Sequence, residues 1–113
     1  MKGSGRARLG DLEFHILLAL GRGEAHGYAI GKEMEERTGG RVDPTTGALY
    51  QALRRLAESG LIEAVRAPSG ESDARRKYFR VTASGRRAAS AEAERLDSLV
   101  ALAREKRLYP ARP

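Results

Sequence analysis

The stretch PTTGALYQALRRLAESGLIE, residues 44–63, decides the fold that we expect. Its first part has the periodicity of a helix, because Leu49, Leu53 and Leu56 fall on one side at about 100° per residue. Gly60 is typical of the position that ends a helix, and the residues after it follow a strand pattern. We therefore predict a helix over residues 44–59 that leads directly into a β-strand.

The side of this helix opposite the leucines is polar and cationic. Glutamine can form two hydrogen bonds to adenine and arginine can form two to guanine, so such a face suits the major groove of DNA. A glycine on the same side lets the helix approach the bases closely. The side chains expected to contact bases are Thr45, Thr46, Gln51 and Arg54, with Gly47 as that glycine. The alternative is a solvated helix face without a partner.

A β-hairpin with a long connection follows this helix. Residues 61–65 (LIEAV) and 77–82 (KYFRVT) have strand patterns, and the residues between them are rich in proline, glycine, serine and charge. The connection exceeds the usual 2–5 residues of a hairpin loop, which indicates a functional extension, or wing, over residues 66–77. Its cationic run would contact the DNA backbone or minor groove, unless it is only a solvated charge run. That run is Arg75, Arg76 and Lys77.

Two helices are expected before this stretch, and one long helix after it. Residues 11–20 (DLEFHILLAL) are apolar around most of a helix, which predicts burial on two sides. The second helix begins near His26 and ends at the glycines 39–40. The final helix extends to about residue 107, or roughly 35 Å, which is more than the rest of the domain can cover.

The first and last helices therefore predict a homodimer, in which each buries apolar side chains against the partner. The alternative is a last helix that folds back on its own domain. The expected interface residues are Leu12, Phe14, His15, Leu96, Leu99, Val100 and Ala103.

The order of elements is that of a winged helix-turn-helix, a mainly α fold with a small β-hairpin and here a long C-terminal dimerisation helix. Residues 1–10 form a flexible basic arm or a tail without specific contacts, residues 11–82 the DNA-binding domain, and residues 83–108 the dimerisation helix. Phosphate contacts are expected from His26 and Tyr28 at the start of the second helix and from Tyr50 on the third. For the tyrosines, the alternative is packing with the hydroxyl in water.

Composition agrees with this interpretation and excludes other classes. The 113 residues suit one domain, and 21 Lys and Arg against 15 Asp and Glu favour a polyanionic partner such as double-stranded DNA. Cysteine is absent, and the two histidines lack the spacing of a metal site, so we expect no metal and no cofactor. The sequence has no nucleophile motif and no glycine-rich phosphate loop, so we do not expect an enzyme. The longest apolar run is too short to span a membrane, so a cytoplasmic protein is expected.

Four segments together resemble the PadR family of bacterial transcriptional regulators: LEFHILLAL, HGYAIGKEMEERTGG, PTTGALYQALRRLAESGLIE and RRKYFRVTASGRRA. The resemblance covers residues 9–108 and is similar to the short members of that family. It implies a dimeric repressor with no catalytic role, and allows for a small aromatic effector at the dimer interface near Phe14 and His15. A winged-helix adaptor for protein or RNA is the alternative function, because fold alone does not settle function.

Overall fold

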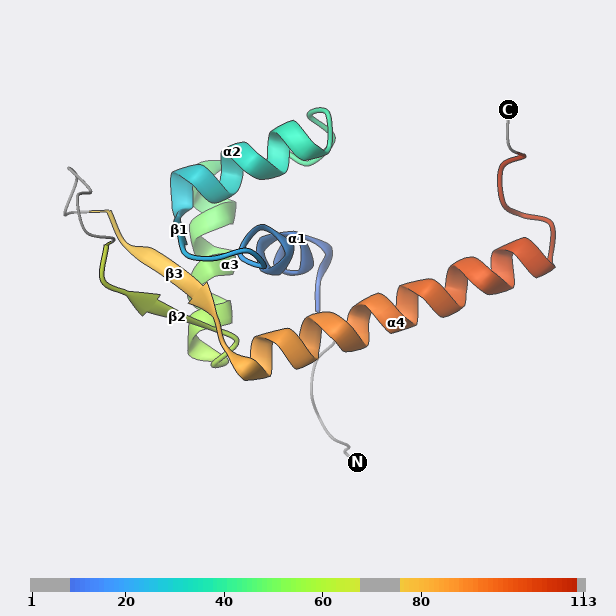
Figure 1. Ribbon diagram of the computed structural model, residues 1–113. Coiled ribbons are helices and arrows are strands. Elements are labelled where there is room, and N and C mark those ends of the chain that lie inside the picture. Colours follow the sequence, from blue (N-terminus) through green and yellow to red (C-terminus); the bar gives the residue numbers. More distant parts are fainter. Residues whose placement is uncertain (1–8, 68–75, 112–113) are drawn as a thin grey trace.

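Four helices and a small three-stranded sheet make up the computed structural model, which describes residues 9–67 and 76–111 (Figure 1). The helices are α1 (Asp11–Ala19), α2 (Gly27–Arg37), α3 (Thr46–Glu58) and α4 (Ala83–Glu105). The strands are β1 (Ala25–His26), β2 (Ile62–Val65) and β3 (Tyr78–Val81). The predicted fold class, mainly α with a hairpin and a long last helix, is confirmed.

The core lies where α1, α2 and α3 meet the hairpin. The leucines that face inward from α3 pack there against side chains of α1, α2 and the first residue of β2. Leu12, which we expected at a dimer interface, lies half-buried at the edge of this core. The buried cluster comprises Ile16, Leu17, Leu20, Ile30, Met34, Leu49, Ala52, Leu53, Leu56, Ile62 and Phe79.

The sheet contains one strand that the sequence did not predict. The order is β1-β3-β2, and both pairings are antiparallel, with Ala25 opposite Phe79 and Glu63 opposite Arg80. Strand β1 has two residues, which is too short to produce an alternating pattern. The second helix begins at Gly27, in agreement with the predicted start near His26, and His26 is both a residue of β1 and the N-cap of α2. The first turn of α2 is therefore fixed beside the hairpin.

Helix α3 is bounded by residues that satisfy its terminal backbone groups. Thr45 is its N-cap, and the hydroxyl of Thr45 accepts a hydrogen bond from the backbone N–H of Ala48 at 3.0 Å. At the other end, Gly60 has a φ of 77°, a conformation that glycine adopts without steric cost. The helix thus begins two residues later and ends one residue earlier than the predicted range of 44–59.

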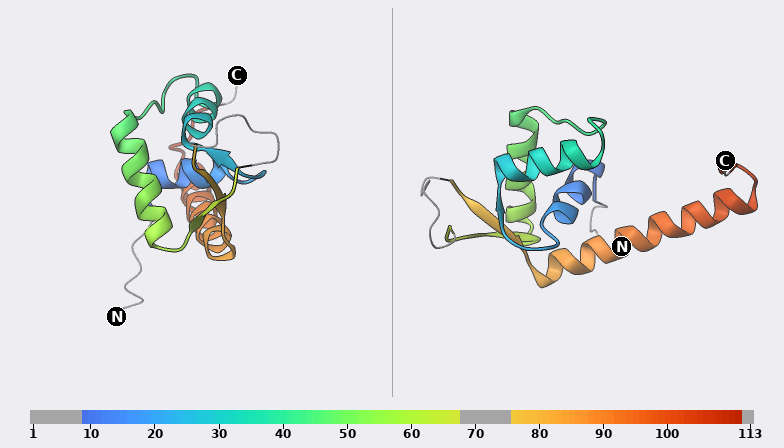
Figure 2. Two further views of the ribbon diagram at one scale, coloured as in Figure 1. Left: turned by 90° about the vertical axis from the view of Figure 1, so that its left-hand side faces the viewer. Right: turned by 45° about the horizontal axis from the view of Figure 1, so that its top comes forward.

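Helix α4 begins directly after β3 and extends away from the rest of the domain (Figures 1 and 2). Thr82 is its N-cap, with its side chain accepting from the N–H of Gly85 at 3.0 Å. The first half of α4 packs against α1 and β3, while its second half extends beyond them. In the described part of the chain, no helix is both long enough and apolar enough to cross a membrane.

Candidate nucleic-acid interface

The outer face of α3 is open to solvent over its whole length. Gln51 and Arg54 are exposed on the side opposite the buried leucines, and Thr46 is exposed in the first turn on the side that faces α2. A Cβ atom built on Gly47 would have no atom within 4 Å, so this glycine also lies on open surface. Thr45 is exposed too, but its hydroxyl already caps the helix. The structure therefore leaves all the residues expected to contact bases accessible, and it places Gly47, Gln51 and Arg54 on one face.

Tyr50 has a packing role as well as an exposed surface. Its ring lies against the first turn of α2, where a Cβ atom on Gly27 would be 2.5 Å from the Tyr50 hydroxyl oxygen. The side chain is nevertheless 47% exposed. The tyrosine thus joins α3 to the start of α2 and leaves part of its phenol at the surface between the two helices.

A shallow groove of about 240 Å³ separates α2 from α3 at this point. Lys32 contributes a cation to its wall, while Glu35 and Asp43 contribute carboxylates. Tyr28, at 62% exposure, lies on the α2 side. The residues that line the groove are Gly27, Tyr28, Gly31, Lys32, Glu35, Asp43, Pro44, Thr46, Leu49 and Tyr50. The groove therefore connects the predicted phosphate-binding tyrosines with the first turn of α3.

The start of α2 and the start of β3 meet in a cluster of aromatic and cationic side chains. The His26 ring stacks on Tyr28 with centroids 6.4 Å apart and meets the Tyr78 ring edge-on at 5.1 Å. The guanidinium carbon of Arg76 lies 5.6 Å from the centroid of the Tyr28 ring. His26, Tyr28 and Arg76 are predicted from the sequence as separate DNA contacts, and the fold brings them into one group.

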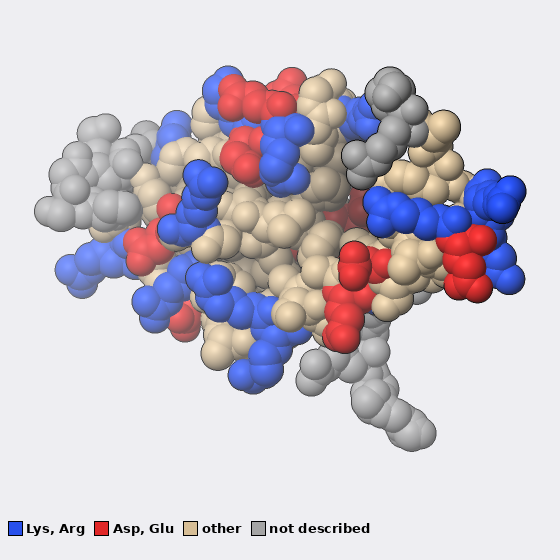
Figure 3. Space-filling model, turned by 45° about the vertical axis from the view of Figure 1, so that its right-hand side comes forward, with Lys and Arg blue, Asp and Glu red and all other residues tan. Residues whose placement is uncertain are grey.

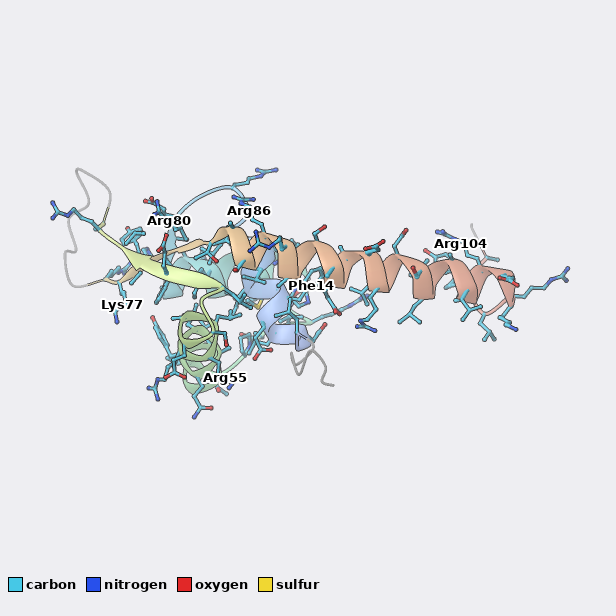
Figure 4. The ribbon with its side chains drawn as sticks, turned by 90° about the horizontal axis from the view of Figure 1, so that it is seen from below. Phe14, Arg55, Lys77, Arg80, Arg86 and Arg104 are labelled. Atoms are coloured by element: carbon cyan, nitrogen blue, oxygen red, sulfur yellow. The ribbon has the colours of Figure 1, made fainter. Side chains whose placement is uncertain are left out.

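The described part of the wing is exposed and basic. Arg76 and Lys77 directly precede β3 and are exposed, whereas Arg75 lies outside the described residues, as do residues 1–8 of the predicted arm. Figure 4 shows Lys77 at the hairpin end of the molecule, opposite the end of α4 that carries Arg104. The two exposed cations thus lie at the same end of the molecule as the cluster at the start of α2.

Two exposed arginines that are not among the predicted site residues hold elements together through carboxylates. The Arg55 guanidinium donates to one oxygen of Glu13, from Nε at 3.0 Å and from Nη2 at 2.6 Å, which links α3 to α1. On the hairpin, Arg80 donates from Nε to Glu63 at 2.6 Å across β2 and β3. The strand register could have indicated the second pair, but the first joins residues far apart in sequence.

The predicted dimer residues form an incompletely covered surface on α1 and α4. Leu99 is 50% exposed and Leu96 is also exposed, whereas Val100 and Ala103 are half-buried. Leu18 on α1 and Leu102 on α4 are further exposed apolar residues that the prediction missed. In Figure 3 uncharged surface lies between the charged residues of α2 and those of α4. Phe14 and His15 are half-buried on α1.

His15 is held between charged groups of two helices. Its Nδ1 lies 3.2 Å from Nη1 of Arg37 on α2, and its Nε2 lies 3.9 Å from a carboxylate oxygen of Asp11 on α1. Since arginine can only donate, Nδ1 is the acceptor in this contact. His15 therefore has a structural role between α1 and α2 in the single chain.

One ion pair on α4 involves a buried carboxylate. Glu92 is buried and accepts hydrogen bonds from Arg95, at 3.0 Å from Nε and 2.5 Å from Nη2. The hydrogen bond with Glu92 raises the pKa of the Arg95 guanidinium above its ordinary value. The pair places a polar group among the apolar residues of α4.

Comparison with known proteins gives a family match over most of the folded part. The model of the family described as "Transcriptional regulator PadR-like family" matches residues 16–91. Among curated proteins, the transcriptional regulator YqjI of Escherichia coli is 40% identical over 53 residues, which are 47% of this chain and 26% of YqjI. The chain spans about a quarter of the length of the curated relatives that it matches.

Solved structures share the same fold. A PadR family transcription regulator from Clostridium difficile superposes with a TM-score of 0.75 at 24% identity, over 85% of this chain and 97% of that one. Bacillus subtilis PadR, solved in complex with operator DNA, gives a TM-score of 0.63 at 26% identity, over 73% of this chain and 46% of that one. The first likeness concerns the fold alone.

Proposed function

The chain belongs to the PadR-like family of transcriptional regulators, and we propose that it binds operator DNA as a homodimer and represses transcription. The observation that carries the proposal is the outer face of α3. Gln51 and Arg54 are exposed there beside Gly47, where a Cβ atom would have no atom within 4 Å. Such side chains can form paired hydrogen bonds to base edges in the major groove. The similar B. subtilis PadR has been solved in complex with operator DNA, which supports DNA binding by this chain.

Phosphate contacts would hold α3 in the major groove of DNA from two sides. Tyr28 and Tyr50 border the shallow groove between α2 and α3, so their hydroxyls are suited to the DNA backbone on that side. Lys77 and Arg76 at the base of the wing would neutralise the backbone or enter the minor groove. Such contacts position the protein, whereas Thr46, Gln51 and Arg54 would supply the sequence preference.

The dimer would form through α1 and α4. Leu96 and Leu99 are exposed on a helix that extends beyond its own domain, and a second copy would cover them in a self-complementary contact. Two α3 helices in one dimer would then contact adjacent half-sites about one turn of DNA apart. An aromatic effector, if one acts here, would enter near Phe14, where α1 and the partner's last helix meet.

A fluorescence-anisotropy titration with DNA from upstream of the chain's own gene tests this function. It is run at two salt concentrations with random DNA as competitor. We expect saturable binding that survives the competitor, weakens steeply with salt and falls in Arg54→Ala. Arg104→Ala removes the same charge at the far end of α4 and serves as the control. Binding that is absent at low salt would favour an adaptor for protein or RNA.

A further inference from the structure

The His26 ring makes two short contacts with hydrogen-bond donors, one at each ring nitrogen. Its Nδ1 accepts the N–H of Ala29 at 3.1 Å, which caps α2, and its Nε2 lies 2.8 Å from Nη1 of Arg76. A neutral imidazole has one acceptor nitrogen and one N–H group, and a protonated ring has no acceptor. The arginine guanidinium only donates. One of the two short contacts of the ring is therefore between two donors.

The helix cap indicates which contact this is. The His26 Nδ1 interaction satisfies a backbone N–H at the start of α2, where a side-chain acceptor is normally required. If Nδ1 accepts there, Nε2 carries the proton and points it toward Arg76. An N–H group and a guanidinium then converge at one point of the surface, and an oxygen anion placed there would accept from both.

We propose that His26 and Arg76 together bind a single phosphate of the DNA backbone, so that the cap of α2 and the base of the wing form one phosphate clamp. The inference rests on the proposed DNA-binding function and makes its phosphate contacts specific. His26 supplies the neutral Nε2–H donor, and Arg76 supplies the positive charge. Strand pairing supports the arrangement, because His26 lies opposite Tyr78 in the β1–β3 ladder and Arg76 is two residues before it.

The surroundings of the pair suit a phosphate from DNA. Both side chains line an open hollow of about 340 Å³, into which Lys32 and Tyr28 also project from α2. Two carboxylates line the same hollow, but each is paired with a cation on its own helix. Glu33 accepts from Arg37 at 3.0 Å, and Glu36 lies 3.6 Å from Lys32. The hollow is wide and shallow, as a contact with the backbone of a duplex requires.

The substitution His26→Asn separates the two functions of the ring. Asparagine is a good N-cap residue, so its side-chain oxygen replaces Nδ1, while the Nε2–H donor is lost. We expect a folded protein with a slightly lower melting temperature, because the ring contacts with Tyr28 and Tyr78 are lost, and DNA binding that is about ten-fold weaker for each bound protomer. Arg76→Ala should lower the slope of log K against log[salt] by about 0.9 per protomer. Lys106→Ala, at the end of α4 far from the wing, is the charge control.

Three outcomes decide the proposal. The loss of DNA affinity caused by His26→Asn should be much smaller in the Arg76→Ala background than in the wild type, because both side chains hold the same phosphate. Full additivity of the two losses would overturn the clamp. The ¹⁵N spectrum of the free protein should show the His26 proton on Nε2, and a proton on Nδ1 would also overturn it. A stoichiometric duplex should shift the Nε2 signal at a phosphate concentration at which inorganic phosphate alone leaves it in place, and a signal that the duplex does not move would overturn the clamp. Wild-type protein that binds no duplex would instead refute the proposed function itself.

Discussion

Replacing Gly47 with alanine should increase stability and weaken DNA binding at the same time. A glycine within a helix costs up to about 1 kcal/mol relative to alanine. Gly47 is the second residue of α3, and a Cβ atom there would have no neighbour within 4 Å. No packing cost therefore offsets the gain in helix propensity, and we expect the free energy of unfolding to rise by up to about 1 kcal/mol.

The same methyl group would stand on the face that enters the major groove. Extra volume in a closely packed contact costs about 1–3 kcal/mol, and 1.4 kcal/mol corresponds to a ten-fold change in affinity. We expect operator binding by Gly47→Ala to be weaker by about ten-fold or more. Urea unfolding at fixed protein concentration measures the stability, and fluorescence anisotropy measures the affinity. Unchanged affinity would refute the close approach of α3, and a loss of stability would refute the assignment of Gly47 to open surface.

Gly85→Ala is the matched control, because the same substitution there meets a different environment. A Cβ atom on Gly85 would fall against the backbone carbonyl oxygen of Leu61 and lie 2.7 Å from a methyl carbon of Val81. Backbone cannot move aside cheaply, so we expect a loss of about 1–3 kcal/mol in the free energy of unfolding, measured in the same urea experiment. A variant as stable as wild type would contradict this packing.

Further substitutions test the core, the helix contacts and the dimer. Leu53→Ala should lower the free energy of unfolding by about 2–5 kcal/mol in urea, because Leu53 is buried in the core; a smaller loss would contradict that burial. Arg55→Ala should cost at most about 1 kcal/mol, because Arg55 is largely exposed and solvent screens its pair with Glu13; a double-mutant cycle with Glu13→Ala measures the coupling. Leu99→Arg should weaken both dimerisation, measured by sedimentation, and DNA binding; a stable monomer that binds fully would refute the dimer.

The helices could be predicted because their signals are local and repeated. Leu49, Leu53 and Leu56 in α3 recur at helical spacing, and all three are buried. The alternating residues of the hairpin were likewise sufficient to predict β2 and β3. Strand β1 escaped prediction because two residues carry no period, and its pairing partner lies more than fifty positions away in the chain. What the sequence predicts well is therefore the pattern within each element.

The site was predicted residue by residue, but its grouping was not. Nothing in the order of the chain indicates that His26 and Arg76 touch, because their contact depends on the pairing of β1 with β3. The link between Arg55 and Glu13 has the same origin in tertiary packing. For Tyr50, the sequence suggested either DNA contact or packing, and the structure gives it a packed ring that is still partly exposed.

Gly85 illustrates how a residue that weakens an element locally can be required by the whole. In the first turn of α4 a glycine lowers helix propensity, and the sequence alone suggests a weak start to that helix. The fold instead needs the missing side chain, because α4 approaches the backbone at Leu61 too closely for a Cβ atom. This contact fixes the angle at which α4 leaves the winged domain. If α4 joins two protomers, the same angle sets the distance between their α3 helices, and hence the half-site spacing. A folded Gly85→Ala protein should then prefer operators with altered spacing, and an unaltered preference would show that the spacing is set elsewhere.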